Sequence, residues 1–187
     1  SAPSQLGAFL KSDKSLETPD LQYHVQPLSL DKFGDPLHSF PAFTAAICNL
    51  RPESRGNVQI NSSNPYEPPK ISPNYLSTIN DRLIASKSIK ITREIINQKP
   101  IANFIVKEYL PGSEYQSDDD LAEQAGNIGT TIFHPVGTAK MGSDYKSVVN
   151  NNLSVHGIKG LKIADASIMP TITSGNTNSP TLMIAEK

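Results

Sequence analysis

The sequence predicts an α+β fold, with antiparallel strands and helices in separate stretches of the chain. Residues 21–26 alternate apolar and polar side chains, which is the period-of-two pattern of a strand with one buried face. From Thr78 to Lys99, apolar residues instead recur at near-helical spacing, which places them on one side of a helix. Because strand and helix patterns occupy separate stretches, the α+β class is favoured.

Several stretches are candidates for the strands of this sheet. In residues 21–26 we expect Leu21, Tyr23 and Val25 to face the core. Residues 40–50 and 56–61 follow as two further strands that we expect to pair antiparallel, and residues 9–10 indicate another strand near the start. Four prolines between residues 64 and 75 predict a surface loop without regular structure, because each removes a backbone donor and fixes a backbone angle.

Two helices have recognisable starts. Thr78, with Asp81 three residues later, is typical of a helix N-terminus, and this helix should run to Lys99. A second helix is predicted from Ser117 toward Gly126. Its three aspartates at 118–120 oppose the positive end of the helix dipole. Because consecutive helical residues point in different directions, this first-turn interpretation is favoured over a cation site.

Composition excludes several classes of protein. The 187 residues contain 17 Lys and Arg against 18 Asp and Glu, so the net charge of −1 does not favour nucleic acid as a partner. Cys48 is the only cysteine, which excludes an internal disulfide and a multi-thiolate metal site. No apolar run approaches the roughly 20 residues that span a bilayer. We expect a cytoplasmic location, and the sequence leaves open a peripheral position at the inner membrane.

The last third of the chain holds the residues that carry chemistry. Residues 134–142 read HPVGTAKMG, residues 160–170 read GLKIADASIMP, and residues 175–181 read GNTNSPT. Histidine has an unperturbed pKa of about 6.5 and can accept and return a proton near neutrality, which suits a general base. A lone histidine is more often a packing or surface residue, but the long motif around His134 favours the functional interpretation. His38, in a predicted loop, is expected at the surface.

Together these three segments resemble the C-terminal signature of the glucose-methanol-choline (GMC) family of flavin oxidoreductases, in particular its choline and alcohol dehydrogenase branch. Residues 49–56, which read NLRPESRG, extend the resemblance toward the middle of the chain. By this resemblance, His134 is the catalytic base and Asn176 its hydrogen-bonding partner. The resemblance also implies flavin-contacting roles for Asp165, Ala166, Asn178 and Thr181, although Asp165 and Asn178 could equally cap a turn and a helix.

The resemblance also implies a domain organisation and partners. Residues 1–133 would form part of a substrate-binding domain, in which helices pack on one face of an antiparallel sheet. Residues 134–187 would supply the active-site loop and the end of an FAD-binding domain. That last part would include a strand at Leu161–Ala164 and a helix from Pro180 capped by Asn178 or Ser179. The phosphate-binding GxGxxG loop is absent. We therefore expect a fragment of a longer protein that does not retain FAD alone and needs the N-terminal FAD-binding portion of the same protein.

The resulting functional prediction is oxidation of a primary alcohol, choline-type or aliphatic or aromatic, to an aldehyde by hydride transfer to flavin. The electron acceptor would be a quinone, a carrier or oxygen. The first alternative is a non-catalytic module that binds a ligand or partner through the sheet when isolated. A hydrolase that uses Ser167 or Ser174 with His134 is less favoured, because no strained nucleophile turn is visible.

Overall fold

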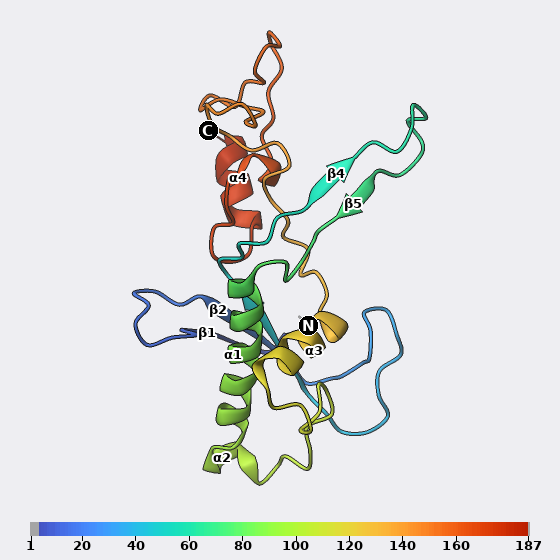
Figure 1. The fold of residues 1–187 in the computed structure, drawn as a ribbon, viewed down its shortest axis with the longest axis vertical. Coiled ribbons are helices and arrows are strands. Elements are labelled where there is room, and N and C mark those ends of the chain that lie inside the picture. The colour runs from blue at the N-terminus through green and yellow to red at the C-terminus, as the bar shows by residue number, and fades with distance from the viewer. Residues whose placement is uncertain (1–3, 187) are drawn as a thin grey trace. The chain divides into compact units, whose positions relative to one another are not determined.

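A three-stranded antiparallel sheet forms the first part of the chain in the computed structural model, which describes residues 4–186. Its strands are β1 (Leu6–Leu10), β2 (Leu21–Gln26) and β3 (Thr44–Asn49), in the order β1-β2-β3 (Figure 1). Leu21 pairs with Leu10 on one side and Asn49 on the other. The predicted strand is confirmed, and Leu21 and Tyr23 are buried as expected, whereas Val25 is only partly buried.

The predicted pairing of the next two strands was wrong. β4 (Asn57–Gln59) pairs with β5 (Lys70–Ser72) in a separate two-stranded sheet, and β3 pairs with β2 instead. The chain between β3 and β4 is held elsewhere, because the backbone N–H groups of residues 53 and 54 donate to the carboxylate of Asp81. β5 lies inside the proline-rich stretch predicted to lack regular structure. It forms because residues 70–72, between two prolines, keep their own N–H donors.

Helix α1 (Ile79–Ile96) covers one face of the sheet (Figure 1). Its predicted start is confirmed, since the Thr78 hydroxyl oxygen accepts a hydrogen bond from the backbone N–H of Asp81 at 3.2 Å. Ile84 packs into the core formed by Leu21 and Tyr23, and the Tyr23 hydroxyl lies 3.0 Å from Thr92 Oγ1. The helix is therefore fixed to the sheet by apolar packing and by a polar contact at its buried face.

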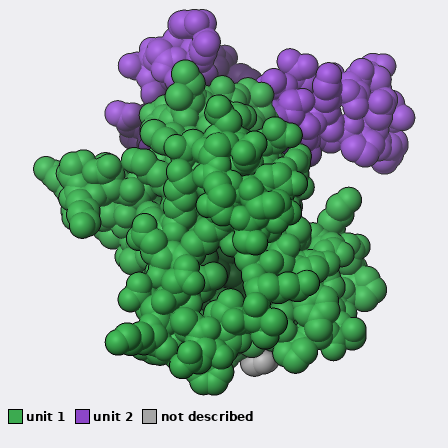
Figure 2. Space-filling model, turned by 60° about the horizontal axis from the view of Figure 1, so that its bottom comes forward, with its two compact units in different colours: residues 1–55, 74–130 green, residues 56–73, 131–187 purple. Residues whose placement is uncertain are grey.

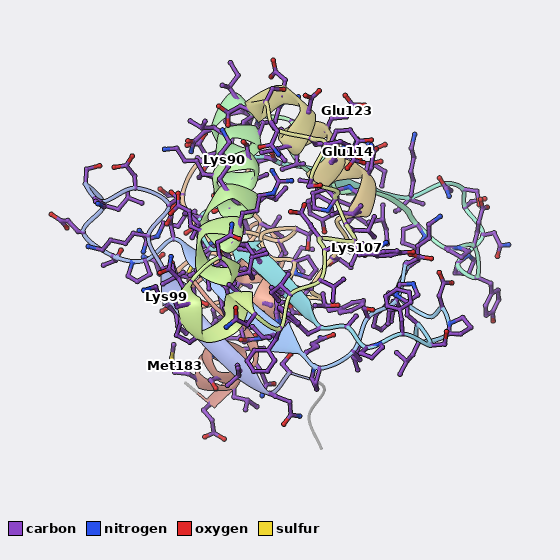
Figure 3. The ribbon with its side chains drawn as sticks, turned by 90° about the horizontal axis from the view of Figure 1, so that it is seen from below. Lys90, Lys99, Lys107, Glu114, Glu123 and Met183 are labelled. Atoms are coloured by element: carbon purple, nitrogen blue, oxygen red, sulfur yellow. The ribbon has the colours of Figure 1, made fainter. Side chains whose placement is uncertain are left out.

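Helix α3 (Asp118–Ile128) packs beside α1 and begins where the sequence predicts. The Ser117 hydroxyl oxygen caps it by accepting from the backbone N–H of Asp120 at 3.1 Å. Asp118 pairs with Lys90 of α1 at 2.9 Å and accepts from the Ser86 hydroxyl; Figure 3 labels Lys90 on α1 and Glu123 on α3. A short helix that the sequence did not predict, α2 (Lys99–Ala102), has its proline in the first turn, where no donor is lost.

The last part of the chain holds a 3₁₀ turn, η1 (Ala166–Ile168), and helix α4 (Asn178–Glu186). The predicted strand at Leu161–Ala164 was wrong. A strand needs a ladder of partners, and in residues 4–186 this stretch makes one isolated bridge, between Ser154 and Lys162. The predicted helix cap was also wrong by one residue, because the Thr177 carbonyl accepts the bond from the N–H of Thr181.

The chain divides into two compact units, coloured separately in Figure 2. Unit 1 contains the residues up to 55 together with 74–130, and unit 2 contains 56–73 together with the residues from 131 onward. Unit 1 thus holds the three-stranded sheet with α1, α2 and α3, and unit 2 holds the β4–β5 hairpin, η1 and α4. The assignment of 1–133 to a substrate-binding domain and 134–187 to a flavin domain stays a prediction.

Within residues 4–186, no helix combines the length and the apolar character needed to cross a bilayer.

Candidate active site

His134 and Asn176 meet in unit 2, although 42 residues separate them in the chain. The Asn176 carboxamide nitrogen lies 2.7 Å from His134 Nε2. The imidazole is half-buried and the carboxamide is exposed, so the pair lies at the surface of its unit. The two residues that the sequence analysis singled out for proton transfer and hydrogen bonding are therefore in direct contact.

The other ring nitrogen of His134 contacts a residue that the sequence analysis did not select. Thr177 Oγ1 lies 2.9 Å from His134 Nδ1, and the Thr177 backbone N–H approaches the same nitrogen at 3.4 Å. Thr177 is buried, with 6% of its surface exposed. Its place directly after Asn176 and directly before a helix was the available signal, because Thr is a favoured residue at helix starts.

The backbone is strained on both sides of this contact. Phe133, immediately before the histidine, has φ = 64°, and Ser174, two residues before Asn176, has φ = 56°. Left-handed backbone is unfavourable for residues with a Cβ, and most of all for bulky ones such as phenylalanine. Strain of this kind costs about 1–3 kcal/mol and clusters at functional sites. Its position here supports a functional reason for holding His134 in place.

The motif that follows His134 lies along the 3₁₀ turn η1. Backbone N–H groups of Ala139 and Met141 donate to the carbonyls of Ser167 and Ile168, at 3.0 and 2.8 Å. Gly137, with φ = 86°, provides the turn into this pairing, and a Cβ there would lie 3.2 Å from the Met169 carbonyl oxygen. Val149, which forms an isolated β-bridge with Met141, and Ile168 are fully buried. The histidine loop is thus anchored by backbone hydrogen bonds to buried residues of its own unit.

The four residues predicted to contact flavin occupy two places in unit 2. Asp165 caps η1, since its carboxylate accepts the backbone N–H of Ser167 at 2.8 Å, and Ala166 is the first residue of that turn. Asn178 is the exposed first residue of α4, and the Thr181 hydroxyl donates to the Thr177 carbonyl at 2.7 Å. Asp165 therefore has the capping role that the sequence left open, and the flavin role of all four stays a prediction.

Two carboxylates near the motif are stabilised in their charged forms. Hydrogen bonds from the Ser167 hydroxyl and backbone N–H lower the pKa of Asp165. The Lys140 ammonium, at 2.8 Å, and N–H and O–H donors from residues 146 and 147 lower the pKa of Asp144 to about 2. Both aspartates therefore carry negative charge at neutral pH. Among residues 4–186, no group of three or more His, Cys, Asp or Glu side chains is arranged to hold a metal ion.

Solved structures with the same fold are oxidoreductases. The chain aligns with pyridoxine 4-oxidase from Mesorbium loti at a TM-score of 0.89 and 27% identity, covering 98% of this chain and 36% of that one. A formate oxidase variant from Aspergillus oryzae RIB40, whose structure concerns the modification of its FAD, aligns at a TM-score of 0.82 and 25% identity. The alignment covers 91% of this chain and 31% of that one. These likenesses extend over both units of the chain.

The sequence comparisons define the family. The GMC oxidoreductase C-terminal family model matches residues 52–185. An alcohol dehydrogenase [acceptor] from Pseudomonas putida is 40% identical over 183 residues, which are 98% of this chain and 33% of that protein. An oxygen-dependent choline dehydrogenase from Cronobacter sakazakii is 40% identical over 181 residues, which are 97% of this chain and 32% of that protein. The chain belongs to the GMC oxidoreductase family and spans about a third of the length of these relatives.

Proposed function

We propose that this chain supplies the proton-accepting part of an FAD-dependent active site that oxidises a primary alcohol to an aldehyde, with His134 as the general base. The observation that carries the proposal is the 2.7 Å contact between His134 Nε2 and the Asn176 carboxamide at the surface of unit 2. A base and a neutral hydrogen-bonding group, held side by side, are suited to bind a hydroxyl and remove its proton. The names of the dehydrogenase relatives support an alcohol substrate.

The residues present fit a flavin. Asn176 and Asn178 are exposed polar side chains on either side of Thr177, at the start of helix α4. A helix N-terminus presents backbone N–H groups and a positive dipole end, which favour a polar or partly anionic ring edge. Asp165, Ala166, Asn178 and Thr181 would hold the cofactor beside the His134–Asn176 pair. A bound flavin would supply the two-electron acceptor for the hydride of the alcohol carbon.

His134 and Asn176 then divide the work on the substrate oxygen. The substrate hydroxyl would replace the Asn176 N–H at His134 Nε2. The carboxamide would then donate to the hydroxyl oxygen, so that the hydroxyl proton points toward Nε2. The O–H bond breaks as Nε2 takes the proton, the C–H bond gives up its electron pair with the hydride, and a C=O bond forms. Asparagine is suited to this position because it hydrogen-bonds oxygen without competing for the proton.

The partners follow from the same chemistry. The substrate would be a small alcohol, choline-type or aliphatic or aromatic, and a quinone, a carrier or oxygen would reoxidise the flavin. The N-terminal FAD-binding portion of the protein would provide the dinucleotide-binding fold, and residues 1–187 alone would not retain FAD. A visible spectrum of this segment after incubation with FAD and gel filtration should show no bound flavin.

Replacement of the proposed base tests the function directly. In the flavin-loaded protein at its natural length, His134→Ala should slow flavin reduction by about 100-fold or more, because a lost general base costs roughly 10²–10⁴-fold in rate. Stopped-flow absorbance of the flavin under anaerobic conditions measures this rate.

His156→Ala is the matched control, since this exposed histidine contacts the Gly142 carbonyl at 3.0 Å and takes no part in the proposed chemistry. It should reduce flavin at the unmodified rate. An unchanged rate in His134→Ala would discard the proposed function.

A further inference from the structure

We propose that Thr177 is a positioning residue for His134: its hydroxyl holds the proton of the neutral imidazole on Nδ1, which leaves the lone pair of Nε2 to accept the substrate proton. This inference rests on the proposed function of His134. It assigns a new role to a buried residue whose side chain would touch neither substrate nor flavin.

The geometry around the ring leads to this assignment. A neutral imidazole has one N–H and one lone pair, and its neighbours decide which nitrogen carries the proton. Thr177 Oγ1 lies 2.9 Å from Nδ1 and can accept a hydrogen bond from Nδ1–H. The Asn176 carboxamide nitrogen lies 2.7 Å from Nε2 and donates to a lone pair there. The two contacts agree on one tautomer, with the proton on Nδ1.

A third contact opposes this tautomer and makes the hydroxyl decisive. The backbone N–H of Thr177 points at Nδ1 from 3.4 Å, where it would favour a lone pair on that nitrogen. This distance exceeds the usual 2.7–3.2 Å of N–H hydrogen bonds, so the shorter hydroxyl contact dominates. Without the hydroxyl, Nδ1–H would have no acceptor there and would face the Thr177 backbone N–H. The proton should then move to Nε2, and the Asn176 carboxamide should turn to present its oxygen to Nε2–H. A ring protonated at Nε2 cannot take the substrate proton there.

Thr177 is fixed well enough to select one tautomer. It is buried, and its carbonyl accepts bonds from both the backbone N–H and the hydroxyl of Thr181, at 3.0 and 2.7 Å. The threonine is thereby held at the start of α4. After proton transfer, both ring nitrogens carry hydrogens, and the Thr177 hydroxyl oxygen still accepts from Nδ1–H without any rearrangement.

Two substitutions separate the hydroxyl from the shape of the side chain. Thr177→Ser keeps the hydroxyl, and Thr177→Val keeps the branched shape and the backbone N–H while removing the hydroxyl. The proton position is read from ¹⁵N chemical shifts of the histidine ring nitrogens in ¹⁵N-histidine-labelled, flavin-loaded protein at its natural length. The His134→Gln spectrum assigns the signals.

In the unmodified protein and in Thr177→Ser, neutral His134 should be protonated at Nδ1; in Thr177→Val it should be protonated at Nε2. Flavin reduction should fall by about 10-fold or more in Thr177→Val and stay within about threefold in Thr177→Ser, in line with the effect of removing an outer hydrogen-bond partner.

Protonation at Nε2 in the unmodified protein overturns the inference without any variant, so it remains testable even if Thr177→Val does not fold. An unchanged tautomer in a folded Thr177→Val also overturns it. These outcomes are distinct from failure of the proposed function, which is an unchanged flavin-reduction rate in His134→Ala.

Discussion

Two histidines, one in each unit, share the same contact on one ring nitrogen and differ at the other. His38 Nδ1 lies 2.8 Å from the Ser29 hydroxyl, much as His134 Nδ1 lies 2.9 Å from that of Thr177. Beyond Nε2, however, His38 faces the carboxylate of Asp31 at 3.3 Å, whereas His134 faces the carboxamide of Asn176. A carboxylate favours the protonated form of an imidazole, and a neutral carboxamide adds no charge.

The surroundings of the two imidazole rings also differ in how far they cover the ring. His38 stacks on Phe40 at 4.6 Å between ring centroids and meets the edge of Tyr109 at 5.0 Å, so its side chain is only 13% exposed. The predicted surface position of His38 was therefore wrong, because these rings cover it. His134 instead lies beside an exposed polar group on a strained loop. The comparison shows that a histidine–hydroxyl contact gains chemical meaning from the group at the second nitrogen.

The largest expected effect comes from giving His134 the kind of partner that His38 has. Asn176→Asp places a carboxylate next to Nε2, where it should hold the substrate-accepting position protonated. We expect stopped-flow flavin reduction to slow by about 100-fold, or about 2.7 kcal/mol of activation free energy. Asn151→Asp, which adds the same charge at an exposed position of unit 2, should leave the rate unchanged. A normal rate of flavin reduction in Asn176→Asp would contradict the claim that the group at Nε2 determines what each histidine can do.

In unit 1, the carboxylate of Asp81 has a structural role, so replacing it should lower the stability of the fold and leave the flavin-reduction rate unchanged. Asp81 is 3% exposed, and its two oxygens accept from the backbone N–H groups of Glu53 and Ser54 and from the Asn49 side chain, at 2.7–3.2 Å. Asp81→Asn puts an N–H donor against these donors and leaves one unsatisfied. Denaturant unfolding should show a loss of about 2 kcal/mol. The exposed Asp119→Asn serves as the control and should change stability by less than about 1 kcal/mol, the usual contribution of a charge at a helix N-terminus.

Asp81 should also account for part of the loss of stability at acid pH. Burial raises the pKa of Asp81, but hydrogen bonds from the Ser54 hydroxyl and from the N–H groups of residues 53 and 54 outweigh it, so the pKa lies below its usual value. The unfolded chain therefore binds a proton first as pH falls. The stabilisation should be complete above about pH 4 and decline below it. Asp81→Asn should show a flatter decline in this range, and an identical pH profile for both proteins would contradict the assignment.

The smallest effect should come from the carboxylate beside His38. The Asp31 side chain is 57% exposed, and its carboxylate also accepts a hydrogen bond from the Tyr109 hydroxyl at 3.4 Å. Because exposed ion pairs contribute little, Asp31→Asn should lower the free energy of unfolding by less than about 1 kcal/mol. A loss above about 2 kcal/mol in denaturant unfolding would show that the His38 cluster is a stabilising centre of unit 1.

The predictable part of the fold was the part encoded in local periodicity. The alternation in β2 and the caps at Thr78 and Ser117 are properties of adjacent residues, and the structure confirms them. The pairing of β4 with β5 was missed because the prolines that flank β5 concealed three residues with intact N–H donors. The Leu161–Ala164 prediction failed for a related reason, since an apolar run specifies a strand only where a partner is available.

The site was predictable to a similar degree. The contact between His134 and Asn176 was expected from the family resemblance of two motifs, because nothing local brings residues 42 positions apart together. Thr177 was missed because threonine between two asparagines at a helix start already has a sufficient explanation as a cap. Its contact with the imidazole depends on the backbone path of the loop through Phe133. Local sequence patterns do not specify that path.

The left-handed backbone at Phe133 has a consequence for protein engineering. Replacing this residue with glycine would relieve conformational energy and, on that account alone, favour the native state. The same replacement would let the peptide preceding the imidazole sample many more orientations, so fewer molecules would present the ring correctly at any moment. At this position, selection for thermal tolerance and selection for turnover should therefore enrich opposite substitutions.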